Sequence, residues 1–355
     1  MKAITTIPPG GGVKLSQVSL ENTKGVRVKT YRTGICGTDK EIAQGKLTFA
    51  RPEIGSSLVM GHEAVGIIAE SVEDSTFKEG DIVVPMVRRP GGCRMCRLGR
   101  QDYCEDGDFV EAGIRGKNGF MREEFIDDPR FLVKVDNPSI RDLAVLTEPL
   151  KNVMKMEETF QFLRTRIPWY CEDSTLSCKN MYVFGTGTEG LLISIVFKSL
   201  GMNVVAVNRH PLNENIMDFL DRNRIDYLDT SSEKLDAKVK DLPMDAAIDA
   251  VGAMDVLKEI TDNVSNNGIA IMFGTSGQLP SHNFDVLERI VDRNIVVVGS
   301  VDGAKNHYAE AIDFIETHGK AMQMDRIITG KYQPEELNIF TEKEKGEIKK
   351  VIAWS

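Results

Sequence analysis

The chain has 355 residues, more than one domain usually needs, and its 41% hydrophobic and 27% charged residues are typical of a folded globular protein. The formal net charge is −9 and the sequence pI is near 5.3, so we expect neither nucleic acid nor a membrane surface as a partner. The sequence lacks the pattern of a secretory signal, and no apolar stretch approaches the ~20 residues that cross a bilayer. These features predict a cytoplasmic protein of two domains.

The first part of the chain, to about residue 150, predicts an irregular β-rich domain, because short apolar runs alternate with glycine, proline and charged turns. This part carries three side-chain types that bind zinc, in Cys36, His62 and Glu148. A catalytic zinc needs three protein ligands and one open position for the substrate oxygen. Taken singly, each residue has an ordinary explanation, as a core cysteine, a hydrogen-bonded turn residue or a helix N-terminal charge. Together they predict a catalytic zinc site.

The other cysteines fall into two groups. Cys93, Cys96 and Cys104 crowd one loop, and in a reducing compartment this crowding indicates metal binding rather than a disulfide. The alternative is a surface loop with free thiols. We interpret Cys171 and Cys178 as ordinary residues of the segment that leads into the second domain.

The second part of the chain, from about residue 180, alternates strands and helices, which is typical of a doubly wound parallel sheet. Residues 181–184, 188–200 and 204–208 predict a strand, a helix and a strand, which form one βαβ unit. Further strands are predicted at 246–249, 269–273 and 295–299, then a helix at 302–318 and a strand at 348–352. Periodicity does not decide where the last stretch packs.

A glycine fingerprint joins the first strand of this alternation to its helix, in the segment Gly185, Thr186, Gly187, Thr188, Glu189 and Gly190. Its glycines let the backbone turn tightly and approach a pyrophosphate, whose charge lies at the helix N-terminus. Glycine-rich turns also occur for purely steric reasons, but this one has the preceding strand and following helix that a nucleotide site requires. We therefore predict a dinucleotide cofactor.

The end of the second strand indicates which dinucleotide is bound. An NAD site usually places Asp or Glu here, about 20 residues after the fingerprint, to hold the ribose 2′-hydroxyl. The chain has Asn208, Arg209 and His210 instead. Arg209 offers donors matched to a 2′-phosphate and His210 adds another, so NADP is favoured and NAD is the second candidate. The alternative is that Arg209 is a solvated surface residue.

Several short segments, taken together, are more specific than any one of them: Gly34-Ile-Cys-Gly-Thr-Asp39, Gly61-His-Glu-Ala64, Arg88-Arg89, Glu111-Ala-Gly-Ile114, Leu146-Thr-Glu-Pro-Leu150, Asn208-Arg209, Gly299-Ser-Val-Asp302 and Gly346-Glu-Ile-Lys349. Through them the chain resembles the zinc-containing medium-chain dehydrogenases, most closely the archaeal-type glucose (aldose) 1-dehydrogenases. The resemblance covers nearly the whole length. It implies a GroES-like β-rich catalytic domain from residues 1–150 and 306–355, and a Rossmann nucleotide-binding domain from residues 151–305.

The resemblance implies a catalytic zinc held or faced by Cys36, His62 and Glu148. Glu63 would lie behind the metal or exchange onto it during turnover, and Thr38 would relay a proton outward. The enzyme would oxidise the C1 hydroxyl of an aldopyranose such as glucose or galactose to the 1,5-lactone, with zinc as a Lewis acid and hydride transfer to NADP. It would act as a dimer or tetramer.

The resemblance also implies contacts to the sugar and the cofactor. Glu111 and Asp302 would accept hydrogen bonds from sugar hydroxyls, and Thr38 and Glu148 complete the substrate-binding set. Val87 stands where some family members carry Asn, so the preference among epimers stays open. The cofactor-binding set further includes Gly274, Thr275, Ser300 and Val301.

The crowded cysteines correspond, by the same resemblance, to a lobe that normally holds a structural zinc with four cysteines. The first cysteine is lost around Gly91 in this chain. Asp108 is the candidate that would complete a site with Cys93, Cys96 and Cys104, because a carboxylate is also a zinc ligand.

Two other functions stay open at this point. A zinc-dependent polyol or alcohol dehydrogenase shares the zinc and cofactor motifs. A non-enzymatic nucleotide-binding protein belongs to a different class, and an intact set of zinc ligands would serve no purpose in it. Assays with sugars, polyols and simple alcohols would separate these functions.

Overall fold

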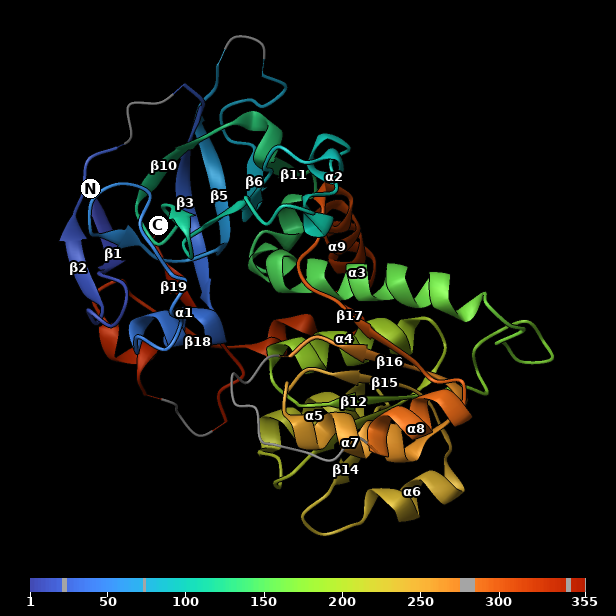
Figure 1. The fold of residues 1–355 in the computed structure, drawn as a ribbon. Coiled ribbons are helices and arrows are strands. Elements are labelled where there is room, and N and C mark those ends of the chain that lie inside the picture. The colour runs from blue at the N-terminus through green and yellow to red at the C-terminus, as the bar shows by residue number, and fades with distance from the viewer. Residues whose placement is uncertain (21–23, 73–74, 275–284, 343–345, 355) are drawn as a thin grey trace. The chain divides into compact units, whose positions relative to one another are not determined.

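The computed structural model of the chain describes residues 1–20, 24–72, 75–274, 285–342 and 346–354. The chain divides into two compact units, and Figure 1 labels many of their helices and strands. Unit 1 comprises Met1–Lys151 and Asp302–Ser355, and unit 2 comprises Asn152–Val301. The division falls within helix α3 (Thr147–Arg164), so its first turn, with Glu148, belongs to unit 1.

A seven-stranded sheet forms the framework of unit 1. Its strands are β3 (Val26–Ile35), β5 (Glu63–Glu70), β6 (Ile82–Pro85), β10 (Glu124–Asp127), β11 (Leu132–Val135), β18 (Ile328–Tyr332) and β19 (Lys349–Ala353). Along the first half of β3, buried residues alternate with more exposed ones, as expected for a strand with one face on the core. Strands β5 and β19 flank β3, both antiparallel to it. The strand predicted at 348–352 is therefore an internal strand of this sheet.

The register of this sheet brings distant segments together. Gly34 of β3 pairs with Glu63, the first residue of β5, and the next residue of β3 pairs with β19. Cys36 follows β3 directly, and His62 directly precedes β5. A Cβ on Gly34 would lie 1.9 Å from Oε2 of Glu63, so only glycine leaves room there for the carboxylate. Candidate residues that are far apart in the sequence thus meet at the ends of neighbouring strands.

The described rest of unit 1 includes two three-stranded sheets, several helices and the first turn of α3. One sheet contains β1 (Lys2–Thr6), β2 (Lys14–Gln17) and β4 (Leu58–Val59), and the other contains β7 (Arg88–Arg89), β8 (Val110–Ala112) and β9 (Gly116–Lys117). The α-helices are α1 (Gly37–Ala43), α2 (Arg94–Arg97) and α9 (Lys305–His318). The 3-10 helices are η1 (Gln101–Tyr103), η2 (Pro129–Phe131), η3 (Pro138–Ile140), η4 (Ala144–Leu146), η5 (Met324–Ile327) and η6 (Leu337–Phe340).

Unit 2 is built on a six-stranded parallel sheet with the order β14-β13-β12-β15-β16-β17. Its strands are β12 (Asn180–Phe184), β13 (Asn203–Asn208), β14 (Asp226–Asp229), β15 (Met244–Asp249), β16 (Val264–Met272) and β17 (Val296–Gly299). Besides most of α3, its described helices are α4 (Thr188–Ser199), α5 (Glu214–Arg222), α6 (Leu235–Asp241), α7 (Met254–Asn263) and α8 (Asp285–Asp292). The strand order runs outward in both directions from β12, which confirms the predicted doubly wound sheet.

The helix predicted at 302–318 is shorter than expected. Helix α9 begins at Lys305, and Ala304 is its N-cap. Asp302 has a φ of 60°, a left-handed conformation that residues with a side chain rarely adopt, so it does not continue the helix. The prediction was wrong at this end, because hydrophobic periodicity does not detect a left-handed residue.

Cys171 and Cys178 form a disulfide in the segment between α3 and β12. Their interpretation as ordinary residues was wrong, because a spacing of seven residues without other signals does not reveal that two cysteines pair. The backbone N–H of Cys178 also donates to Sγ of Cys171, at 2.9 Å. The free cysteines are Cys36, Cys93, Cys96 and Cys104.

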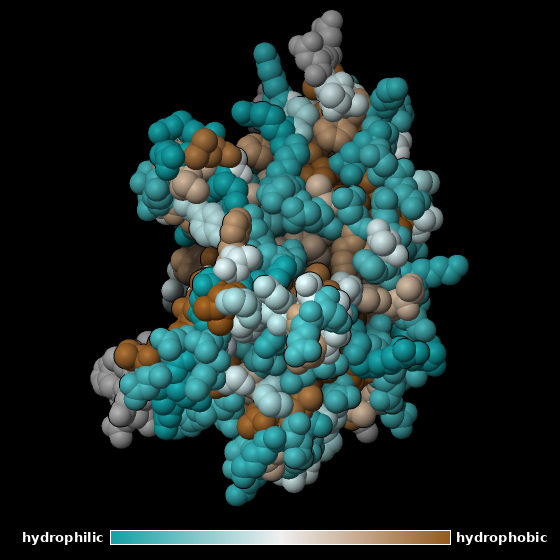
Figure 2. All heavy atoms as spheres, turned by 90° about the vertical axis from the view of Figure 1, so that its right-hand side faces the viewer, coloured by the Kyte–Doolittle hydropathy of each residue, from teal (hydrophilic) through white to brown (hydrophobic). Residues whose placement is uncertain are grey.

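The surface carries mainly hydrophilic side chains on the face drawn in Figure 2, with hydrophobic ones dispersed among them. Large exposed hydrophobic residues, such as Ile54 and Phe162, come from separate segments. Such scattered exposure is normal for a folded protein. Among the described residues, no helix is both long enough and apolar enough to span a membrane.

Candidate active site

Cys36 and His62 meet at the end of the main sheet of unit 1. Sγ of Cys36 lies 3.0 Å from Nε2 of His62, and His62 is only 5% exposed. Cys36 is also the N-cap of α1, and its sulfur accepts a hydrogen bond from the backbone N–H of Thr38 at 3.2 Å. A sulfur and a buried ring nitrogen this close together suit a shared metal ion.

Asp39 contacts both residues. Its Oδ2 accepts the backbone N–H of Cys36 at 3.0 Å, and its Oδ1 lies 3.4 Å from Nδ1 of His62. A carboxylate on the far nitrogen fixes the orientation of an imidazole and commonly supports a metal-binding histidine. We assigned no role to Asp39 from the sequence, although its place three residues after Cys36 has the spacing of a capping box.

Two carboxylates complete the cluster. Oxygen atoms of Glu63 and Glu148 and a ring nitrogen of His62 all lie within 4.8 Å of one another, and all three residues are buried. Lys349 forms an ion pair with Oε2 of Glu63, and each side chain is 2% exposed. Burial raises the pKa of Glu63, although the Lys349 ammonium opposes this effect. No role was predicted for Lys349, because a buried lysine cannot be told from a surface lysine in the sequence.

The donor set fits a zinc ion. His62 belongs to two groups of donors, one with Cys36 and Asp39 and the other with Glu63 and Glu148. Burial alone lowers the pKa of His62, but Cys36 and Asp39 outweigh it and raise this pKa well above its usual value. The same negative surroundings favour a divalent cation, and thiolate, imidazole and carboxylate are all zinc ligands.

Glu111 and Asp302 lie in a network of buried ion pairs in unit 1. Nη2 of Arg88 donates to Oε1 of Glu111 at 2.9 Å, and Nε of Arg88 lies 3.1 Å from Oδ2 of Asp302. Nζ of Lys151 donates to Oδ1 of Asp302 at 2.5 Å and lies 3.3 Å from Oε1 of Glu148. These five side chains are at most 14% exposed, and we call them the charge network. It links a candidate zinc ligand to both predicted sugar contacts.

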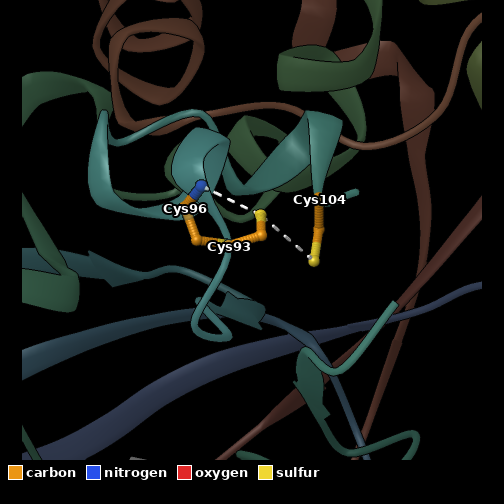
Figure 3. A group of neighbouring side chains, drawn as sticks. All are labelled: Cys93, Cys96 and Cys104. Atoms are coloured by element: carbon orange, nitrogen blue, oxygen red, sulfur yellow. Dashed lines mark hydrogen bonds between the residues drawn. The ribbon is translucent and has the colours of Figure 1, made fainter. Parts of the chain in front are cut away.

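The crowded cysteines form a second donor group, with sulfur atoms within 4.8 Å of one another. Cys93 caps α2, and its sulfur accepts the backbone N–H of Cys96 at 3.4 Å and lies 3.9 Å from the sulfur of Cys104 (Figure 3). Hydrogen bonds from the backbone of Cys96 and Glu105 lower the pKa of Cys93 to about 7. Burial raises the pKa of Cys96 to about 12. Cys93 therefore forms a thiolate near neutral pH, and the thiolate is the form that binds a metal.

Asp108 stands beside these cysteines. Its Oδ1 accepts a hydrogen bond from Sγ of Cys104 at 3.5 Å, and its Oδ2 accepts the backbone N–H of Gly92 at 3.0 Å. A Cβ on Gly91 would lie only 1.5 Å from Oδ1 of Asp108. The carboxylate therefore fills the space that a side chain at residue 91 would need, and it lies beside Cys104, although the donor group itself comprises only the three cysteines.

The glycine fingerprint of unit 2 connects β12 to α4. Gly185 has a φ of 103°, which strongly favours glycine. A Cβ on Gly190 would lie 2.0 Å from the carbonyl oxygen of Gly185, so the helix packs directly on the turn. Gly187 is the N-cap of α4, and a Cβ there would meet nothing within 4 Å. The turn thus leaves open space at a helix N-terminus, which fits a pyrophosphate.

A cavity of 230 Å³ lies beside this turn, and its lining includes Gly185, Asn208, Arg209, His210 and Glu259. The Arg209 guanidinium lies 3.5 Å from Glu259 and 3.8 Å from Asp255, both on α7. The sequence shows no carboxylate at residues 208–210, but these two carboxylates of α7 reach Arg209 in space. Arg209 is therefore a cavity-lining residue that is 47% exposed, rather than only a solvated surface residue.

The remaining predicted cofactor residues follow β16 and β17. Gly274 comes shortly after β16, and Ser300 and Val301 come directly after β17. Ser300 is buried, whereas Val301 is exposed and its carbonyl accepts a hydrogen bond from Nζ of Lys155 at 2.8 Å. These positions lie at the carboxyl ends of parallel strands, where doubly wound sheets bind ligands. Thr275 lies outside the described residues.

Two family profiles together match most of the chain. The alcohol dehydrogenase GroES-like domain matches residues 22–137, and the glucose dehydrogenase C-terminus matches residues 141–354. The chain belongs to the glucose dehydrogenase family. Its fold is accordingly the medium-chain dehydrogenase fold, with a GroES-like domain and a Rossmann-like parallel sheet.

Curated members of the glucose dehydrogenase family match the chain over its whole length. Glucose 1-dehydrogenase of Thermoplasma acidophilum is 41% identical over 99% of this chain and 99% of that protein. Glucose 1-dehydrogenase of Metallosphaera sedula is 38% identical over 100% of this chain and 99% of that protein. The solved structure of Haloferax mediterranei glucose dehydrogenase, in complex with NADP, Zn and gluconolactone, has a TM-score of 0.90 and 26% identity, with 100% of this chain and 99% of that chain covered.

Proposed function

We propose that the chain is a zinc-dependent glucose 1-dehydrogenase that oxidises the C1 hydroxyl of an aldopyranose to the 1,5-lactone and reduces NADP. The observation that carries this proposal is the position of His62, a buried residue that belongs both to the donor group with the partly exposed Cys36 and to the donor group with the buried Glu63 and Glu148. The curated relatives bear the name glucose 1-dehydrogenase, and the Haloferax mediterranei structure contains NADP, zinc and gluconolactone. Unit 1 would carry the chemistry and unit 2 the nucleotide.

The residues of unit 1 would hold the metal and the sugar. Cys36, His62 and Glu148 would bind zinc, and Glu63 would exchange onto it or remain behind it, paired with Lys349. When bound, zinc supplies Lewis acidity that makes the substrate hydroxyl a stronger acid. Thr38, two residues after Cys36 and partly exposed, would carry the hydroxyl proton outward.

The sugar contacts would come from Glu111 and Asp302. Each carboxylate already meets two cations, Glu111 with Arg88 and Arg115 and Asp302 with Arg88 and Lys151, but a carboxylate has about four acceptor sites. Each can therefore also accept a hydrogen bond from a sugar hydroxyl. Val87 is buried and offers no polar side chain, so a contact that some family members make with Asn would be missing.

The nucleotide site would be the fingerprint turn and the adjoining cavity of unit 2. The pyrophosphate would lie at the N-terminus of α4, which carries a partial positive charge. Arg209 would meet the 2′-phosphate of NADP, with Asn208 and His210 beside it. Gly274, Ser300 and Val301 would line the nicotinamide end of the same sheet edge.

Steady-state kinetics with glucose, galactose, sorbitol and ethanol, each with NADP and with NAD, tests the proposal. We expect kcat/KM to be highest for an aldose with NADP. A preference for sorbitol or ethanol would instead indicate a polyol or alcohol dehydrogenase. No turnover of any of these compounds, in a protein that binds zinc and NADP, would indicate a nucleotide-binding protein without this activity.

We further propose that Cys93, Cys96, Cys104 and Asp108 hold a structural zinc. Asp108→Ala should lower the metal content from two zinc ions per chain to about one, because a three-cysteine site would lack its fourth protein ligand. Metal analysis of the purified protein by atomic absorption measures this change.

Two variants make the test of this second zinc sharper. Asp106→Ala removes a nearby exposed carboxylate and should leave the zinc content unchanged. The double variant Gly91→Cys with Asp108→Ala places a thiol in the space that the carboxylate vacates, so it should restore the second zinc. Two zinc ions in Asp108→Ala, or one in the wild type, would exclude Asp108 as a ligand.

The assembly and the cellular location are also proposals. We propose a homodimer or homotetramer in the cytoplasm, on the family resemblance and the composition of the sequence. Light scattering coupled to size-exclusion chromatography would measure the mass, and a monomer of 39.5 kDa would contradict this assembly.

A further inference from the structure

Lys151 lies between two carboxylates with different proposed roles, Glu148 as a zinc ligand and Asp302 as a contact to the sugar. Its ammonium donates to Oδ1 of Asp302 at 2.5 Å and lies 3.3 Å from Oε1 of Glu148. The three side chains are between 4% and 8% exposed. An ion pair at this depth is screened far less by water and salt than a surface pair. The ammonium therefore acts strongly on the positions of both carboxylates.

The surroundings of Lys151 leave its side chain little freedom. A Cβ on Gly303 would lie 2.9 Å from Cδ of Lys151, so the lysine stem packs directly against the backbone of residue 303. Its ammonium also lies 6.0 Å from the centre of the Tyr308 ring, which is fully buried. A long side chain confined in this way loses little entropy when it holds its partners, which suits a fixed support.

Asp302 needs such a support because its backbone is in the left-handed region, with a φ of 60°. A non-glycine residue persists in this region when the surrounding structure holds it there, and such residues cluster at functional sites. Arg88 and Lys151 hold its two carboxylate oxygens separately, at 3.1 Å and 2.5 Å. The orientation of Asp302 is thus defined from both sides.

We propose that Lys151 is a positioning residue that holds Glu148 toward the metal and Asp302 toward the sugar at the same time. Zinc affinity and sugar affinity then depend on one shared ammonium group. This inference rests on the proposed function, because it uses the assignment of Glu148 to zinc and of Asp302 to the substrate. It adds Lys151, for which no role was predicted from the sequence.

The competing explanation is that Lys151 only neutralises two buried carboxylates. A lone Lys151→Met change would leave two buried charges with one cation fewer, and it risks unfolding for that reason alone. The double variant Lys151→Met with Asp302→Asn removes one charge of each sign. Asp302→Asn alone is its matched control, because it keeps the pair between Lys151 and Glu148.

Two readouts test the proposal in these variants. The first is the dissociation constant for zinc, measured by competition with a metal-buffering chelator in the absence of sugar, and supported by the visible spectrum of the cobalt-substituted protein. The second is the separation of KM for glucose from kcat. Asp302→Asn should raise KM for glucose about tenfold, because a carboxylate acceptor of the sugar is lost, and leave zinc affinity unchanged, because the pair between Lys151 and Glu148 remains.

The double variant should show the same increase in KM and, in addition, bind zinc about 10–100-fold more weakly, as is typical when a group that orients a ligand is removed. The cobalt spectrum should shift in the double variant and not in Asp302→Asn. Equal zinc affinity in the two variants would overturn the positioning role of Lys151. A wild-type protein that binds no zinc in unit 1 would instead overturn the proposed function, and this inference with it.

Discussion

Replacing His62 with alanine should lower kcat/KM for glucose by about a thousandfold, or about 4 kcal/mol of transition-state stabilisation. His62 contributes to both donor groups of the candidate zinc site, one with Cys36 and one with Glu63 and Glu148. Its loss therefore leaves neither group complete. Because the nucleotide fingerprint lies in unit 2, NADP binding should change by less than about twofold. Steady-state kinetics, zinc analysis and fluorescence titration with NADPH measure the three quantities.

A matched control for this change is His318→Ala. The centre of the His318 ring lies 4.7 Å from that of the Phe314 ring near the end of α9. Among the described residues, His318 belongs to no group of side chains that could bind a metal. This variant should keep its zinc and its activity. Wild-type protein stripped of zinc by a chelator should behave like His62→Ala, with nucleotide binding retained and sugar oxidation lost. Full activity in the metal-free protein would rule out the zinc-dependent mechanism.

The fold could be predicted wherever a periodic pattern and a turn signal agree. The βαβ unit around Gly185 was confirmed because apolar runs, a glycine turn and a helical pattern all point to one structure. The start of α9 was mispredicted because hydrophobic periodicity does not reveal the left-handed backbone of Asp302. The disulfide between Cys171 and Cys178 depends on a three-dimensional approach that their spacing does not encode.

Some residues of the candidate site could likewise be predicted from the sequence, and others could not. Cys36, His62 and Glu148 were predicted as zinc ligands because thiol, imidazole and carboxylate are the side-chain types that bind zinc, and each of them occurs in a group of possible metal donors. Lys151 and Lys349 were missed because lysine is usually exposed, and only the packing of a folded protein reveals a lysine that is 4% or 2% exposed. Sequence thus identifies candidate metal ligands more readily than the residues that pair with them.

Replacing Arg209 with alanine should raise KM for NADP about 10–100-fold and change KM for NAD by less than about twofold. Arg209 lines the cavity beside the fingerprint turn. Its guanidinium forms ion pairs with the carboxylates of Asp255 and Glu259, at 3.8 Å and 3.5 Å. Its removal deletes the partner of the 2′-phosphate. It also leaves two carboxylates that repel this phosphate, so the loss should exceed that of one ordinary surface ion pair.

The matched control is Arg222→Ala, an arginine of unit 2 with a similar exposed fraction of 45%, paired with Asp218 within α5. It should affect neither cofactor. Glu259→Gln should act in the opposite direction to Arg209→Ala and lower KM for NADP several-fold, because it removes a negative charge that competes for the guanidinium. Titration with 2′,5′-ADP and with 5′-AMP measures the same preference without turnover. If Arg209→Ala weakens both nucleotides equally, the arginine does not read the 2′-phosphate, and the choice between NADP and NAD must come from other residues of the cavity.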